Sequence, residues 1–204
     1  MQVPTTYRIG GDIEVNRLGF GAMRISGKGV CGWPKDRPRV QKVLRRAAEI
    51  GVNFIDTANA YGPETSEYLL QEHLHPYQGL LIATKGGLER GGPRNWTTNG
   101  RPAHLKIACI NSLRRLEVDC IDLYQLHAID DEVPLEDSIG ALRELQDEGK
   151  IRHIGVSNFK VEEIERARKI VKVVSVQNRY NLLDREHDGV VQYCQEQDLS
   201  LIHI

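Results

Sequence analysis

The sequence of 204 residues lacks a long hydrophobic run and a strongly charged segment of either sign. No apolar stretch approaches the roughly 20 residues that span a bilayer, and residues 1–7 contain no apolar segment behind a basic flank. The formal net charge is −1 and aromatic residues make up 6% of the chain. Such a composition offers no basic surface for a phosphate backbone. We therefore expect a cytoplasmic protein that binds neither membranes nor nucleic acid.

Cysteine is also scarce, and the four cysteines are far apart, with no C-x-x-C pair and no histidine at zinc-ligand spacing. Neither a disulfide framework nor a metal site is expected. Apolar residues make up 40% of the chain, which is enough for one hydrophobic core. The composition thus predicts a single domain over residues 1–204.

Apolar runs alternate with amphipathic stretches from residue 54 onward, a pattern typical of βαβ units with a parallel sheet. The six runs start about 29 residues apart on average, close to the roughly 30 residues of one βαβ unit. With an earlier run near residue 20, seven parallel strands are predicted: Leu18–Ala22, Phe54–Asp56, Leu80–Thr84, Ile121–Leu126, His153–Val156, Val173–Val176 and Leu199–Ile204.

Helices are predicted between the strands, where apolar residues have helical spacing. Gly51 and Gly149 stand where a helix end favours left-handed backbone. Near the N-terminus, residues 10–12 (GGD) separate Tyr7–Ile9 from Ile13–Val15 and predict a β-hairpin. The predicted helices are Val40–Ile50, Ala103–Leu116, Leu135–Glu148 and Val161–Val171.

Together these elements predict an α/β fold of the (β/α)8 TIM-barrel type that is incomplete. A closed barrel of this type has eight strands and typically about 250 residues. The sequence stops inside the apolar run 201–204 (LIHI), so we interpret it as C-terminally truncated, with the final strand and helix units missing and the last few residues of uncertain origin. The N-terminal hairpin would cap one end of the barrel. A smaller open sheet with helices on both faces is the alternative.

Four polar residues lie at or just after predicted strands, where barrel enzymes carry their catalytic groups. Asp56 ends one strand, Lys85 and His127 follow two others, and Tyr61 lies in the loop after Asp56. Each alone also fits a structural role, such as a cap, a turn or an ordinary hydrogen bond. Four residues of these types at successive strand ends favour a shared site.

The chemistry of these four residues suits carbonyl reduction, in which the carbon gains a hydride and the oxygen gains a proton. Tyr61 is the candidate acid, and the cation of Lys85 would lower its pKa from the usual value near 10. Asp56 would hold Lys85 by an ion pair. A neutral His127 would donate a hydrogen bond to the developing oxyanion.

Several segments resemble the aldo-keto reductase family, and the resemblance covers nearly the whole chain. Residues 56–62 (DTANAYG) resemble the D-T-A-x-x-Y-G signature of the family. Residues 83–85 (ATK) resemble its lysine strand, and residues 122–127 (DLYQLH) resemble its histidine strand. Residues 154–159 (IGVSNF) resemble its G-V-S-N-F segment. The resemblance implies a nicotinamide-dependent reductase of aldehydes or ketones.

By the same resemblance, Tyr61 is the proton donor, Lys85 and Asp56 tune it, and His127 orients the substrate. NADPH is the implied cofactor, although the sequence itself does not separate NADPH from NADH. Three residues would hold the nicotinamide carboxamide, which needs both donors and acceptors: Ser157, Asn158 and Gln177. Without the family, residues 157–158 would be read as a helix N-cap.

The substrate pocket is assigned from residues 23–37, which resemble the M-R-x-x-G-x-G-x-W-G-x-P-x-D-R loop of bacterial members related to pyridoxal reductases. Cys31 and Trp33 shift its aromatic position by two. We therefore expect Arg24 and Trp33 to bind substrate. The glycine pairs 86–87 and 91–92 predict a mobile loop beside Lys85.

Two other interpretations remain at this stage. One is a regulatory module that keeps the barrel and the cofactor pocket but acts through protein contacts. The other is an inactive fragment of the reductase, because an unclosed barrel exposes strand edges. As an enzyme, the protein would have a small carbonyl compound as its partner. No oligomeric state is predicted.

Overall fold

A computed structural model describes residues 5–93 and 95–203. Its centre is a seven-stranded sheet in the order β11-β10-β9-β8-β5-β4-β3, and the pairing between neighbours is parallel throughout. The strands are β3 (Phe20–Gly21), β4 (Phe54–Asp56), β5 (Leu81–Gly86), β8 (Ile121–Leu126), β9 (Ile151–Ser157), β10 (Val173–Asn178) and β11 (Ser200–His203). The seven predicted strands are thus confirmed, with shifted ends. Ile204, predicted as the end of the last strand, lies outside the described residues.

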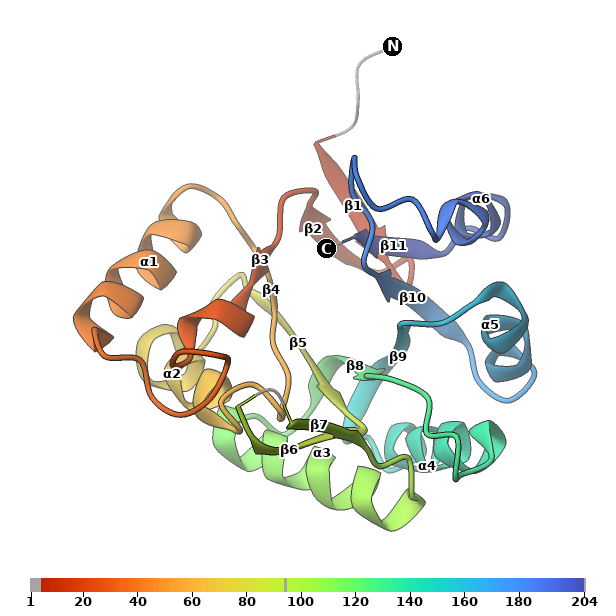
Figure 1. The fold of residues 1–204 in the computed structure, drawn as a ribbon. Coiled ribbons are helices and arrows are strands. Elements are labelled where there is room, and N and C mark those ends of the chain that lie inside the picture. The colour runs from red at the N-terminus through yellow and green to blue at the C-terminus, as the bar shows by residue number, and fades with distance from the viewer. Residues whose placement is uncertain (1–4, 94, 204) are drawn as a thin grey trace.

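Helices follow most strands and lie around the outside of the curved sheet (Figure 1). They are α1 (Arg37–Glu49), α2 (Thr65–Leu74), α3 (Pro102–Leu116), α4 (Leu135–Asp147), α5 (Val161–Arg168) and α6 (Asp188–Glu196), with a short 3-10 helix η1 (Ala22–Ile25) after β3. The sheet therefore curls into part of a (β/α) barrel. In the described part of the chain, no helix is both long and apolar enough to cross a bilayer.

The predicted N-terminal hairpin is present as β1 (Thr6–Ile9) and β2 (Ile13–Asn16). Gly10 and Gly11 have φ of +65° and +90°, which the turn requires and glycine adopts without steric cost. Ile9 and Val15 pack in one apolar cluster with Phe54, Leu81 and other inward residues of the sheet. The hairpin therefore plugs one end of the curled sheet, as predicted.

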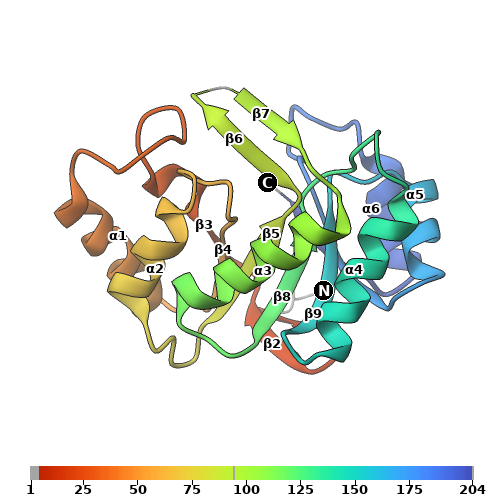
Figure 2. The same cartoon turned by 90° about the horizontal axis from the view of Figure 1, so that it is seen from below.

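The segment after Lys85 is a second hairpin, which corrects the predicted mobile loop. It consists of β6 (Leu88–Gly92) and β7 (Asn95–Thr98), paired antiparallel. Figure 2 shows this hairpin at one end of the molecule and β2 at the opposite end. The hairpin thus stands at the end where the carboxyl ends of β4, β5 and β8 lie.

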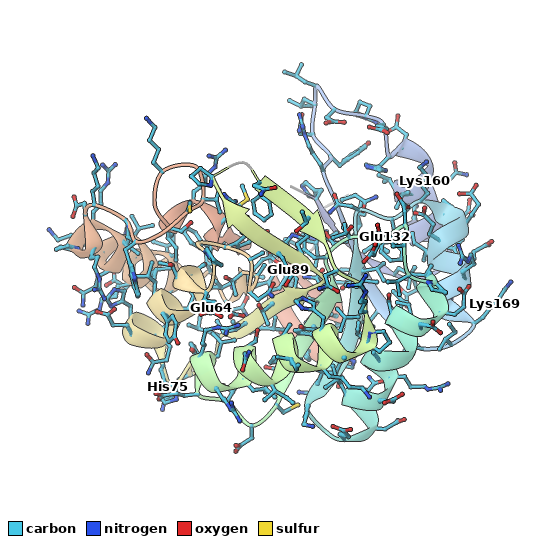
Figure 3. All side chains as sticks on the ribbon, turned by 60° about the horizontal axis from the view of Figure 1, so that its bottom comes forward. Glu64, His75, Glu89, Glu132, Lys160 and Lys169 are labelled. Carbon is cyan, nitrogen blue, oxygen red and sulfur yellow. The ribbon has the colours of Figure 1, made fainter. Side chains whose placement is uncertain are left out.

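Helix α2 was not predicted, because polar residues share its buried face with Leu69 and Leu70, where a core-facing helix is normally apolar throughout. Glu67 is fully buried on this face. Its two carboxylate oxygens accept hydrogen bonds from Thr84 Oγ1 and Arg115 Nε, both at 2.6 Å. Arg115 also reaches Glu64 at 3.0 Å, a residue labelled in Figure 3. This network joins α2 and α3 to β5 through Thr84. Helix α6 was also not predicted.

The sheet is open between its edge strands β3 and β11. A cavity of about 540 Å³ lies there, lined mostly by apolar residues such as Phe20, Phe54 and Leu201. Asp56 is also part of this lining. The cavity on the open side of the barrel therefore extends to Asp56, at the carboxyl end of β4.

We expect Glu67→Gln to destabilise the fold by about 3–5 kcal/mol, because it removes the buried carboxylate of the Arg115 guanidinium and leaves only the half-exposed Glu64 as its charged partner. Urea denaturation measures the change. The matched control is Glu49→Gln, which breaks the exposed pair with Arg46 and should cost less than about 1 kcal/mol. Equal effects of the two substitutions would contradict this role of Glu67.

Candidate active site

The carboxyl ends of β4, β5 and β8 are fixed by hydrogen bonds that continue the sheet ladder into the following loops. Thr57 N donates to Ala83 O at 2.8 Å, and His127 N donates to Gly86 O at 2.9 Å. Asn59 N donates to Lys85 O at 3.2 Å. The loop that carries Tyr61 and the residue His127 are therefore held against the strand that carries Lys85.

Lys85 is fully buried and its ammonium has two close partners. Nζ donates to Asp56 Oδ2 at 2.7 Å and to Thr57 O at 2.8 Å. Burial acts to lower the pKa of Lys85, but the negative charge of Asp56 and the Tyr61 hydroxyl outweigh it, so the pKa of Lys85 ends above its ordinary value. Lys85 is therefore a permanent cation inside the barrel at neutral pH.

The second oxygen of the Asp56 carboxylate is held by two buried amides. Gln125 Nε2 and Gln177 Nε2 donate to Asp56 Oδ1 at 3.2 and 2.9 Å. Gln125 was not among the predicted site residues. Its position in β8, two residues before His127, was the available signal, since the alternation of a strand places such residues on one face. Gly155 leaves room for it, because a Cβ there would lie 2.9 Å from Gln125 Cγ.

Tyr61 lies beside the ammonium. Lys85 Nζ is 3.5 Å from the Tyr61 hydroxyl and 5.2 Å from the centre of its ring. Burial raises the pKa of Tyr61, Lys85 opposes this, and Asp56 adds to it, so the net shift is upward. This corrects the expected lowering of the Tyr61 pKa. The cation reduces the effect of burial without reversing it, and the phenol stays protonated at neutral pH.

His127 completes the group of four predicted residues. The ring centres of His127 and Tyr61 are 5.6 Å apart, with the planes nearly perpendicular. Burial and the charge of Lys85 hold the pKa of His127 well below its usual value. The imidazole is therefore neutral at pH 7. Its Nδ1 has no hydrogen-bond partner among the described residues.

The three residues expected to hold the cofactor lie on the same end of the sheet. Ser157 ends β9 and pairs in register with Gln177 of β10. Asn158 has a left-handed φ of +61°, and its Nδ2 donates to His127 O at 3.0 Å. Helix α5 begins later, with Lys160 as its N-cap. Ser157 and Asn158 are therefore not a helix cap.

The two residues expected to bind substrate are not brought together with this cluster. Trp33 is 50% exposed, and its ring stacks on Tyr68 of α2 with Arg37 at 4.5 Å. Arg24 is exposed on η1. The aromatic neighbour of the site is Trp96 of β7, whose ring centre lies 6.4 Å from that of Tyr61 and 6.5 Å from that of His127.

Residues 17–204 match the Aldo/keto reductase family, and the chain belongs to this family. It is 48% identical over 192 residues to an uncharacterized oxidoreductase of Schizosaccharomyces pombe, covering 94% of this chain and 63% of that protein. It is 42% identical over 188 residues to the pyridoxine 4-dehydrogenase of Escherichia coli, covering 89% of this chain and 66% of that protein. The chain thus spans less than two thirds of the length of these relatives.

Solved structures show the same fold. A glycerol dehydrogenase of Gluconobacter oxydans is 31% identical with a TM-score of 0.88, covering 98% of this chain and 62% of that one. An aldo/keto reductase of Klebsiella pneumoniae in complex with NADP and acetate is 26% identical with a TM-score of 0.81, covering 98% and 67%. The incomplete barrel predicted from the sequence is therefore confirmed.

The lowered pKa of His127 predicts a pH effect on stability. Below the usual histidine pKa of about 6.5 the unfolded chain binds a proton at this position and the folded chain does not. The free energy of unfolding should therefore fall with acidification, by up to about 1.4 kcal/mol per pH unit from this residue. In His127→Gln that contribution should be absent, as measured by urea denaturation between about pH 7 and about pH 5.

The control for this measurement is His75→Gln, at an exposed histidine labelled in Figure 3. It should keep the slope of the parent protein. If His127→Gln and the parent show the same slope, His127 does not remain neutral in the fold.

Proposed function

We propose that this chain forms a single domain that carries the catalytic site of a carbonyl reductase, which converts an aldehyde or ketone to an alcohol. The observation that supports this most is the placement of the Tyr61 hydroxyl 3.5 Å from the fully buried Lys85 ammonium, with a neutral His127 ring beside it. A proton donor, a cation and a neutral hydrogen-bond donor therefore meet at one point. That set of groups suits an oxygen that becomes negative and is then protonated.

The cofactor would be a nicotinamide, and buried polar atoms of this chain fit it. The nicotinamide carboxamide offers both a donor and an acceptor. Gln177 Oε1 is buried and has no hydrogen-bond partner among the described residues, so it is free to accept from such an amide. The hydroxyl of Ser157 and the amide of Asn158 lie on the neighbouring strand end. When bound, the reduced nicotinamide supplies the hydride. We assign NADPH because the Klebsiella pneumoniae relative is in complex with NADP.

Each residue of the site has a distinct task in this proposal. Tyr61 donates its proton to the substrate oxygen, and the Lys85 cation stabilises the phenolate that remains. Asp56 holds Lys85 in place, and its own orientation is fixed by Gln125 and Gln177. His127 remains neutral and donates a hydrogen bond to the same substrate oxygen, which fixes the direction of the carbonyl group.

The names of the relatives suggest which substrates to test first. The E. coli relative is named for its action on pyridoxine, and the Gluconobacter oxydans structure is named for glycerol. We therefore propose pyridoxal, together with a simple aromatic aldehyde, as first test substrates for NADPH oxidation in the full-length protein.

Tyr61→Phe should lower turnover by about 10²–10⁴, because the substrate oxygen loses its positioned acid. The dissociation constant for NADPH should change less than about twofold, since the phenol does not hold the cofactor in this proposal. Initial rates and a fluorescence titration with NADPH measure the two quantities.

Unchanged turnover in Tyr61→Phe would remove Tyr61 from the mechanism. If the unsubstituted full-length protein binds NADPH but turns over neither aldehyde, the cofactor-binding regulatory module becomes the better interpretation.

A further inference from the structure

The most exposed ring beside the proposed catalytic residues belongs to Trp96. Tyr61 and His127 are 5% and 6% exposed, whereas Trp96 is 37% exposed. Its ring meets both at steep angles, 84° to Tyr61 and 69° to His127. A carbonyl oxygen bound between Tyr61 and His127 would therefore carry its substituents past the indole.

The indole is held in this position by Arg90. Arg90 and Trp96 are direct partners across the β6–β7 ladder, so their side chains share one face of the hairpin. The Arg90 guanidinium lies over the indole at 3.9 Å from the ring centre. An arginine at this distance attracts the ring face by a cation–π interaction and by stacking.

The hydrogen bonds of Arg90 connect the hairpin to the loop above Tyr61. Arg90 Nη2 donates to Gly29 O at 2.8 Å and to Gly92 O at 3.2 Å. Val30, next to Gly29, packs in one cluster with Tyr61. The loop of residues 26–33 and the hairpin thus meet through one guanidinium.

The base of the hairpin is tied down separately. Glu89, labelled in Figure 3, accepts a hydrogen bond from Asn99 Nδ2 at 3.1 Å, and His104 of α3 lies 3.5 Å from it. The hairpin is therefore fixed at its base by Glu89 and along its length by Arg90. Trp96 therefore lies beside the site on a hairpin that is fixed by contacts to α3 and to the loop of residues 26–33.

We propose that Trp96, positioned by Arg90, is the residue that selects flat aromatic carbonyl compounds over short aliphatic ones. A flat ring stacks on an indole and gains contact that a three-carbon chain does not. The proposal rests on the carbonyl reductase function proposed above and adds a substrate class to it. It replaces Trp33, the tryptophan favoured by the sequence, whose ring packs on Tyr68 instead.

The test compares benzaldehyde with propanal, each reduced by the full-length protein with NADPH. In Trp96→Ala the ratio of kcat/KM for benzaldehyde to that for propanal should fall about tenfold, through a higher KM for benzaldehyde. Trp96→Phe should retain most of the ratio. Trp96→Leu, which keeps apolar bulk without a ring, should behave like Trp96→Ala.

Arg90→Met tests the positioning role, because it removes the guanidinium and keeps a flexible side chain. The ratio of kcat/KM for benzaldehyde to that for propanal should fall, through a higher KM for benzaldehyde. The matched control is Tyr193→Ala, which breaks another arginine–aromatic pair, with Arg168, between α5 and α6. It should leave the benzaldehyde to propanal ratio unchanged.

Three results would overturn the proposal: an equal loss for both aldehydes in Trp96→Ala and Trp96→Leu, no change in either variant, or a shift of the ratio in Trp33→Ala instead. Tyr61→Phe separates this proposal from the one on which it rests. If Tyr61→Phe loses turnover on both aldehydes and the Trp96 variants keep the parent ratio, only the substrate selection by Trp96 fails.

Discussion

The buried ammonium of Lys85 is the constraint on which the rest of the site depends. Removing such a charge from water costs several kcal/mol, and the fold must supply partners that offset it. Asp56 and the carbonyl of Thr57 supply them at 2.7 and 2.8 Å. Asp56 in turn needs partners for its other oxygen, and Gln125 and Gln177 provide them from β8 and β10. The burial of one cation therefore requires polar partners on other strands, up to three positions away from β5 in the sheet order.

This requirement divides the barrel interior into two halves. The half near the N-terminal hairpin is apolar, with Ile9 and Val15 packed on inward residues of the strands. The other half holds Lys85, Asp56 and their amide partners. Because neighbouring strands are parallel and in fixed register, every polar residue at a carboxyl end adds to the same layer. The same curled sheet thus supplies a stable base at one end and a charged site at the other.

The sequence predicted the parts of the molecule that follow simple periodicity. Seven parallel strands and four helices were found because their apolar residues recur at regular spacing, and the four candidate catalytic residues were found because they follow those strands. Helix α2 was missed because Glu67 and Ser66 occupy its buried face, where their hydrogen-bond partners come from distant residues. Trp96 was missed for a related reason. Its position depends on a hairpin whose glycines indicated a loop, and on an arginine contact that no local pattern reveals.

The opposing effects on Tyr61 explain why the ammonium must be so close. Burial alone makes the phenolate costly, and Asp56 makes it costlier still, so the pKa of Tyr61 stays above its ordinary value despite Lys85. In the proposed mechanism, a high pKa keeps the proton on Tyr61 until a substrate oxygen accepts it. After that transfer, the phenolate would lie beside the cation that opposes the cost of its burial. Burial, with the same cation as a smaller contribution, holds the pKa of His127 down and keeps that ring neutral. Burial and the Lys85 charge together therefore suit the two rings to the tasks proposed for them, Tyr61 as the group that gives up a proton and His127 as the group that keeps one.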